Sequence, residues 1–213
     1  MRDVYHEELD SIGSTLIEMT GLVGAAMTRA TAALLEADLQ VAESVISADD
    51  AVDALQQELD ARALDLLARQ QPVAGDLRTI ITSLRMSADL ERMGDLARHV
   101  AKVARLRYPE IAVPADLRGT IQEMGRIAGE LAQKTAEIIE GRDVDTAREL
   151  PVDDDAMDLL HRDLFSALLH KTAEYSVETA IDVTLIGRYY ERFADHAVSV
   201  SKRLVFLVTG EHD

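Results

Sequence analysis

The sequence of 213 residues contains no cysteine and no tryptophan, and only 4% of its residues are aromatic. Without cysteine, the chain can form no disulfide framework and can use no thiol in catalysis. The low aromatic content argues against a large β-sheet, whose faces usually need aromatic and β-branched side chains, while the many Ala and Leu residues favour helices. We therefore expect an all-α protein.

Two further shortages limit where the protein acts and what it binds. No apolar run is long enough to span a bilayer, and the first eight residues hold no apolar signal core, so we expect a cytoplasmic protein. Lys and Arg number 22 against 39 Asp and Glu, which gives a net charge of −17. This charge disfavours direct binding to nucleic acid, because such binding depends on cationic side chains that neutralise phosphates.

The most informative feature that is present is an internal repeat. Residues 88–100 correspond to residues 188–200, and upstream, at an offset five residues larger, 49–53 correspond to 154–158 and 36–39 to 141–144. The extra residues of the first copy are expected between Arg69 and Asp76, where Pro and Gly mark a break, against a tighter stretch from Lys171 to Val177. The repeat keeps charged residues as well as apolar ones: Glu91, Arg92, Asp95 and Lys102 fall on Glu191, Arg192, Asp195 and Lys202.

Apolar residues recur at helical spacing in six segments, with no convincing strand. The expected helices cover residues 4–37, 39–69, 76–108, 115–140, 143–175 and 176–208, with an interruption of the fifth at Pro151. Long helices joined by short connections must run antiparallel to their neighbours. This predicts two tandem three-helix bundles, residues 1–110 and 111–213. A single six-helix array with a shared core is the alternative that the pattern leaves open.

The repeated carboxylates suggest a cation site. Glu91 and Asp95 are four residues apart and therefore lie on one face of a helix. Together with Asp49, Asp50 or Asp53 of the preceding helix they would supply enough oxygen ligands for Mg, Mn, Ca or iron. The second copy offers the same arrangement with these residues: Glu191, Asp195, Asp154, Asp155 and Asp158.

Simpler interpretations compete with this one. Glu91 and Asp95 could form surface salt bridges with Arg92, Arg98 or Lys102, but such pairs contribute less than about 1 kcal/mol each, which poorly explains their repetition. His161 follows Asp158 by three residues, and a solvated helix face is the interpretation we favour for it. No histidine has Glu three positions before it, and no phosphate loop or nucleophile elbow is present. A metal-dependent hydrolase or oxidase and a generic acidic protein-binding scaffold remain the alternatives.

Four segments together resemble the PhoU family of bacterial phosphate-transport regulators. They are His6–Leu9, the acidic stretch Asp49–Asp53, the stretch Arg69–Arg78 around Pro72, and Leu90–Asp95. The resemblance covers essentially the whole chain. It implies a duplicated protein of two three-helix bundles, often dimeric, that is not an enzyme.

The resemblance also implies partners and a metal. Family members are cytoplasmic adaptors that restrain phosphate uptake and the starvation response through the sensor histidine kinase and the ATP-binding subunit of the phosphate ABC transporter. Some bind metal, such as iron, zinc, manganese or magnesium, through residues that correspond here to Glu91, Asp95, Glu191 and Asp195, with Asp49, Asp53, Asp154 and Asp158 adjoining. In the second copy Ala194 replaces the family's Gly and Phe193 its aliphatic residue, so the two copies need not bind metal equally.

Overall fold

The computed structural model describes residues 2–70, 72–170 and 174–211, and it confirms the all-α prediction. Its helices are α1 (Arg2–Glu36), α2 (Leu39–Gln70), α3 (Gly75–Arg107), α4 (Arg118–Gly141), α5 (Val144–His170) and α6 (Val177–Thr209). None of the helices within those described ranges combines the length and the apolar composition that a membrane-spanning helix needs.

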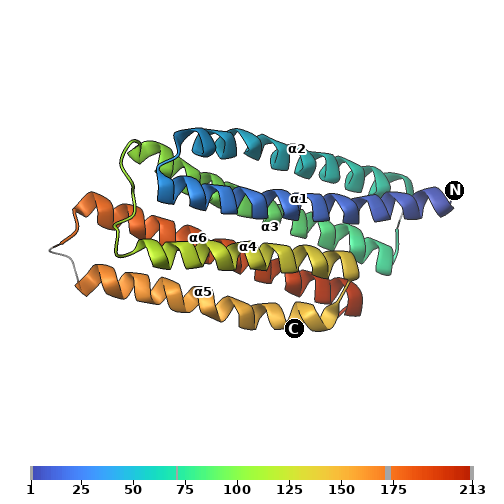
Figure 1. The fold of residues 1–213 in the computed structure, drawn as a ribbon. Helices are drawn as coiled ribbons and strands as arrows, with labels where there is room; N and C mark the ends of the chain where they lie inside the picture. Colours follow the sequence, from blue (N-terminus) through green and yellow to red (C-terminus); the bar gives the residue numbers. More distant parts are fainter. Residues whose placement is uncertain (1, 71, 171–173, 212–213) are drawn as a thin grey trace.

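The helices form two three-helix units that lie side by side (Figure 1). The first unit is α1–α3 and the second is α4–α6, as the repeat predicts. Helix α1 also packs on α4, and α3 packs on α6, so these four helices form a common centre. Helix α2 lies outside this centre against α1 and α3, and α5 lies outside it against α4 and α6. The two units therefore share one core, while the limits of the repeats at 110 and 111 stay a prediction.

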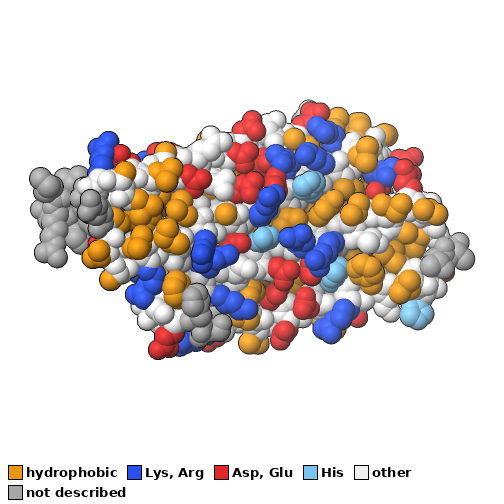
Figure 2. Space-filling view, turned by 180° about the vertical axis from the view of Figure 1, so that it is seen from behind, with side chains coloured by type: hydrophobic (Ala, Val, Ile, Leu, Met, Phe, Trp, Pro, Cys, Tyr) orange, Lys and Arg blue, Asp and Glu red, His pale blue; other side chains and the backbone are white. Residues whose placement is uncertain are grey.

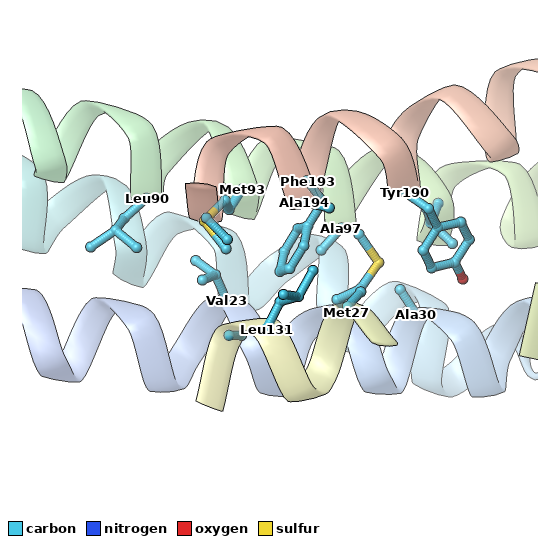
Figure 3. Close-up of a cluster of buried hydrophobic side chains, with 14 of the residues drawn as sticks. Val23, Met27, Ala30, Leu90, Met93, Ala97, Leu131, Tyr190, Phe193 and Ala194 are labelled. Carbon is cyan, nitrogen blue, oxygen red and sulfur yellow. The ribbon is translucent and has the colours of Figure 1, made fainter. Parts of the chain in front are cut away.

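The shared core is built from apolar side chains of all four central helices (Figure 3). Met93 of α3 and Phe193 of α6, which are equivalent residues of the repeat, both point inward and are completely buried. They meet Val23 of α1 and Leu131 of α4, which are also buried. Because apolar burial is the main favourable term in folding, this contact holds the two units together.

One repeated segment proves to be a helix junction. Ala37 and Arg142 have left-handed φ angles of 53° and 49°, which end α1 and α4. The next residue in each copy is an aspartate that caps the following helix: Asp38 accepts a hydrogen bond from the amide of Val41 at 3.0 Å, and Asp143 accepts one from that of Thr146 at 3.1 Å. The sequence match between residues 36–39 and 141–144 therefore reflects the same turn geometry in both copies.

Three details of the predicted helices are wrong. Helix α5 runs through Pro151 without interruption, although the proline has no N–H to donate to the carbonyl of Ala147. Helix α4 begins at Arg118 rather than at residue 115. The connection expected to hold five extra residues contains only 71–74, and α2 with 32 residues is longer than α5 with 27. The counterpart that was predicted to be tighter spans 171–176, and its residues 171–173, where α5 was predicted to continue, lie outside the described residues.

Helices α1 and α4 approach closely because small residues line their contact. A Cβ atom on Gly125 would lie 2.5 Å from Cγ2 of Thr31, and one on Gly24 would lie 2.9 Å from Cβ of Ala132. Both distances are far below normal van der Waals contact, so neither glycine can carry a side chain without movement of a neighbour. The hydroxyl of Thr31 also shares a hydrogen bond of 2.7 Å with that of Tyr190 on α6. Small residues thus bring α1 and α4 into close contact, and this contact joins the two units.

Ion pairs join the units on the opposite side, between α3 and α6. Near the end of α3, Nε of Arg107 donates to Oδ2 of the buried Asp182 at 2.5 Å. Further back along α3, Asp89 accepts from Nε of Arg203 at 2.6 Å and contacts Nδ1 of His196 at 3.1 Å. Since the later part of α3 meets the earlier part of α6, the two helices run antiparallel.

Candidate functional site

The predicted carboxylates of the first repeat form a face between α2 and α3. Asp49 and Asp53 come from α2, and Glu91 and Asp95 come from α3. The side chains of Asp49, Glu91 and Asp95 are 5%, 22% and 16% exposed, so this is a partly covered face rather than a solvated one. We call these four residues the first acidic face.

Gly94 allows this face to form at close range. A Cβ atom at Gly94 would lie only 3.0 Å from Oδ1 of Asp49 and 3.5 Å from Cγ1 of Val23. The absence of a side chain therefore lets α2 bring Asp49 against α3. In the second repeat the equivalent residue is the buried Ala194, and Asp154, the counterpart of Asp49, is only half-buried.

Arg98 neutralises part of the first acidic face. Its Nη1 lies 2.6 Å from Oδ2 of Asp49, and its Nη2 donates to Asp95. Burial raises the pKa of Asp49, and the repulsion of Asp53 and Asp95 adds to that, while Arg98 opposes it. Burial and the charge of Asp95 likewise raise the pKa of Glu91. The face is therefore a crowded anionic cluster with an internal counter-ion.

The second acidic face consists of Asp154 and Asp158 on α5 and Glu191 and Asp195 on α6. It has no equivalent of Arg98, because Val198 stands at that position. Burial, followed by the charges of Asp158 and Asp195, raises the pKa of Asp154 to about 7. The charged groups that shift the pKa of Asp154 most are all carboxylates, whereas Arg98 opposes the corresponding shift of Asp49 in the first face; Arg188 pairs with Glu191 instead.

The two carboxylate oxygens of Glu191 differ in their surroundings. One of its oxygens accepts from Nη1 of Arg188, whereas Oε2 is buried and has no hydrogen-bond partner among the described residues. Burial, and next the charge of Asp195, raise the pKa of Glu191. A buried carboxylate oxygen without a donor is costly, and a cation would relieve that cost.

His161 also belongs to the second face, which corrects its interpretation as a residue of a solvated helix surface. Its side chain is half-buried, its ring packs edge-on against Phe165 at 4.9 Å between centroids, and its Nε2 is buried with no hydrogen-bond partner among the residues that the structure describes. Gly187 makes room for the ring, since a Cβ there would lie 3.3 Å from Cδ2 of His161. Burial lowers the pKa of His161, and Arg188 lowers it further.

The structure thus sorts the eight predicted ligands into two separate sets of four. Each set joins an outer helix to a central one. In the part of the chain that the structure describes, no three Asp, Glu or His side chains are already arranged to hold a metal ion. Cation binding at either face would require side chains to rotate, and the prediction of a metal site stays a prediction.

Comparisons with known proteins concern almost the whole chain. The model of the PhoU domain matches residues 16–104 and again residues 121–204. The chain is 49% identical over 210 residues to the phosphate-specific transport system accessory protein PhoU homolog 2 of Mycobacterium tuberculosis, and the alignment covers 99% of each protein. It is 48% identical to PhoU homolog 1 of Mycobacterium leprae, over 99% of this chain and 95% of that relative.

Solved structures agree with these relatives. The crystal structure of PhoU from Pseudomonas aeruginosa matches with a TM-score of 0.85 at 27% identity, over 97% of this chain and 100% of that one. The phosphate transport system regulatory protein PhoU from Streptococcus pneumoniae matches with a TM-score of 0.88 at 25% identity, over 98% and 99% of the two chains. The similarity therefore extends to both repeats.

Proposed function

The chain belongs to the PhoU domain family, and from this premise we propose that it is a cytoplasmic regulatory adaptor of phosphate homeostasis. It restrains high-affinity phosphate uptake and the phosphate-starvation two-component response when phosphate is plentiful. One observation carries the proposal: the chain is 49% identical, along 99% of both proteins, to relatives that are named accessory proteins of a phosphate-specific transport system and not enzymes.

The adaptor acts by contact with two proteins of that system, the ATP-binding subunit of the phosphate ABC transporter and the sensor histidine kinase. Affinity capture tests this directly. A tagged copy should retain both proteins from cells grown with ample phosphate, and it should retain them less well from phosphate-starved cells.

Because a net charge of −17 attracts basic proteins unspecifically, the control bait is an unrelated helical protein of equal charge. Capture of the same proteins by both baits, or capture that does not respond to phosphate, would contradict the adaptor proposal. The homodimer that the resemblance implies stays a prediction.

We further propose that the acidic faces bind a divalent or transition metal ion, and that the second face binds it more tightly. Asp154, Asp158, Glu191 and Asp195 would be the ligands there. Two observations support this choice: the carboxylates around Asp154 raise its pKa, and Oε2 of Glu191 has no hydrogen-bond partner among the described residues. In the first face Asp49, Asp53, Glu91 and Asp95 would be the ligands, but Arg98 already supplies a positive charge. A bound ion would supply charge neutralisation, which draws the outer helix onto the centre.

Metal content can distinguish the two faces. In the double variant Asp154→Asn/Asp195→Asn we expect bound metal, measured by elemental analysis after dialysis, to fall by more than in Asp49→Asn/Asp95→Asn. Affinity should also fall as the pH is lowered from about 8 to about 6, because Asp154 with a pKa of about 7 takes up a proton that competes with the cation.

The matched control is Asp163→Asn, which removes a charge from an exposed position of the same helix α5. It should retain the wild-type metal content. Equal metal loss in the two double variants would contradict the assignment to the second face, and a wild-type protein that binds no added metal would contradict both sites.

A further inference from the structure

A pocket of about 520 Å³ lies between α3 and α6, where the two repeats meet. Its lining includes three arginines, two histidines and a tyrosine, namely Arg92, Arg188, Arg192, His99, His196 and Tyr189. Figure 2 shows Lys, Arg and His side chains across the middle of the face behind the view of Figure 1, between groups of Asp and Glu. In a chain with a net charge of −17, such a concentration of cationic side chains needs an explanation.

The duplication itself builds this pocket. Arg92 and Arg192 are equivalent residues of the two copies, and α3 and α6 pack antiparallel near these positions. The two arginines therefore line the same pocket from opposite sides. A metal site accounts for the repeated carboxylates but gives no role to the repeated arginine, whereas a ligand in this pocket would contact one arginine from each repeat.

The cationic groups are available to a ligand to different degrees. Arg192 makes no ion pair with any described residue. Arg92 donates to Oδ2 of Asp95 at 3.1 Å, and Arg188 donates to Glu191, but their side chains are still 63% and 51% exposed. Arginine carries five donors, so each of these side chains keeps free N–H groups.

Two other features shape the pocket. The ring of His99 stacks on Tyr189 with a centroid distance of 5.2 Å and an angle of 28° between the planes, which gives one wall a flat aromatic surface. His196 is held by Asp89 through Nδ1 at 3.1 Å. Both contacts cross between the repeats, so the pocket is fixed by the packing of α3 on α6.

One negative group faces the pocket as well. Asp95 belongs to the lining, but Arg92 and Arg98 both donate to its carboxylate. Its charge is thus shared by two guanidinium groups, one of which lies outside the lining. The remaining lining residue, Leu96, is uncharged. The charged groups that line the pocket therefore favour an anion.

We propose that this pocket binds a small phosphate-bearing anion, either inorganic phosphate or the phosphate group of a nucleotide. The planar guanidinium group matches the oxygens of a tetrahedral oxyanion and donates two parallel hydrogen bonds to it. The volume lies within the range of ligand pockets in proteins. The choice of phosphate over other oxyanions rests on the proposed function, whereas the anion site itself rests on the arginines.

Calorimetric titration tests the proposal on the full chain, with inorganic phosphate, sulfate and ATP added separately at constant ionic strength and without divalent cations. We expect saturable binding of phosphate or ATP to the wild-type protein. Binding should weaken by about tenfold or more in Arg92→Gln/Arg192→Gln, since each arginine removes charge-assisted hydrogen bonds.

The control variant is Arg62→Gln/Arg126→Gln, which makes the same charge change at two exposed arginines outside this pocket. It should bind the anion as the wild type does, and both double variants should keep the thermal midpoint of a folded protein. Equal affinity for phosphate and ATP identifies the phosphate group alone as the ligand, while tighter binding of ATP identifies a nucleotide with its base on the wall of Tyr189.

Three outcomes would overturn the proposal: no saturable binding of either ligand, equal weakening in both double variants, or sulfate binding as tight as that of phosphate. The capture experiment separates this result from the proposed function. If the wild-type protein binds no anion but still captures its partners in a phosphate-dependent way, the pocket alone is rejected. Anion binding without capture of the transporter subunit or the kinase rejects the adaptor role and leaves the pocket in place.

Discussion

Replacement of Phe193 by alanine should lower the free energy of unfolding by about 3–5 kcal/mol, the usual cost of removing a fully buried aromatic side chain. Phe193 has no exposed surface and lies where all four central helices meet, beside Met93, Val23 and Leu131 (Figure 3). The cavity left by the ring would lie in the contact between the two repeats. Urea unfolding followed by circular dichroism measures the change.

Two other variants make this result specific. Phe193→Met places the residue of the first repeat in the second and keeps most of the buried apolar volume, so it should cost clearly less than Phe193→Ala. Leu64→Ala removes an apolar side chain that is 64% exposed on α2, and its effect should stay within about 0.5 kcal/mol. If Phe193→Ala were no more harmful than Leu64→Ala, the shared core would not be what holds the repeats together.

Gly125→Ala should lower the free energy of unfolding by about 2 kcal/mol, although alanine is the better helix former. The new methyl group would lie 2.5 Å from Cγ2, 2.7 Å from Oγ1 and 3.1 Å from Cβ of Thr31. Rotation of Thr31 cannot clear its own Cβ, and its hydroxyl is bonded to Tyr190 and to the carbonyl of Met27. Helices α1 and α4 must therefore move apart.

The matched control for this variant is Gly21→Ala. Gly21 is an exposed residue inside α1, and a Cβ there would meet nothing within 4 Å, so the change should stabilise the protein by about 0.5–1 kcal/mol. A double-mutant cycle with Thr31→Ala identifies the clash. Thr31→Ala should cost less in the Gly125→Ala background than in the wild type, and strictly additive effects would contradict steric contact between the two positions.

The repeat and the apolar spacing predicted the six helices, because each helix buries one continuous stripe and the stripe is visible in the sequence. They did not predict that α5 continues through Pro151, the eighth residue of this helix, where packing against α4 and α6 outweighs the lost hydrogen bond and the crowding by the proline ring. Nor did they distinguish two separate three-helix bundles from a six-helix array with a shared core. That choice depends on Gly24 and Gly125, whose role becomes visible only once α1 and α4 are placed together.

The site was predictable to a similar extent. Helical spacing placed Glu91 with Asp95 and Glu191 with Asp195, and in the structure each pair lies near aspartates of the preceding helix, while their role as metal ligands stays a prediction. The difference between the two acidic faces was visible only in part. The sequence offered Arg98 as one of several salt-bridge partners, but the helical pattern did not indicate that it would bridge Asp49 and Asp95. The arginine pocket was not predictable, because it joins residues of different repeats.

The placement of α2 and α5 outside the four-helix centre has a consequence for how the protein can respond to a signal. Each outer helix packs on the centre along one side only, and it contributes half of the carboxylates of one acidic face. If the faces bind a cation as proposed, charge repulsion across an empty face would weaken the packing of the outer helix, and the bound cation would strengthen it. The pocket lies between the central helices α3 and α6 and includes no residue of α2 or α5, so on this proposal a change in the packing of either outer helix would leave its lining in place.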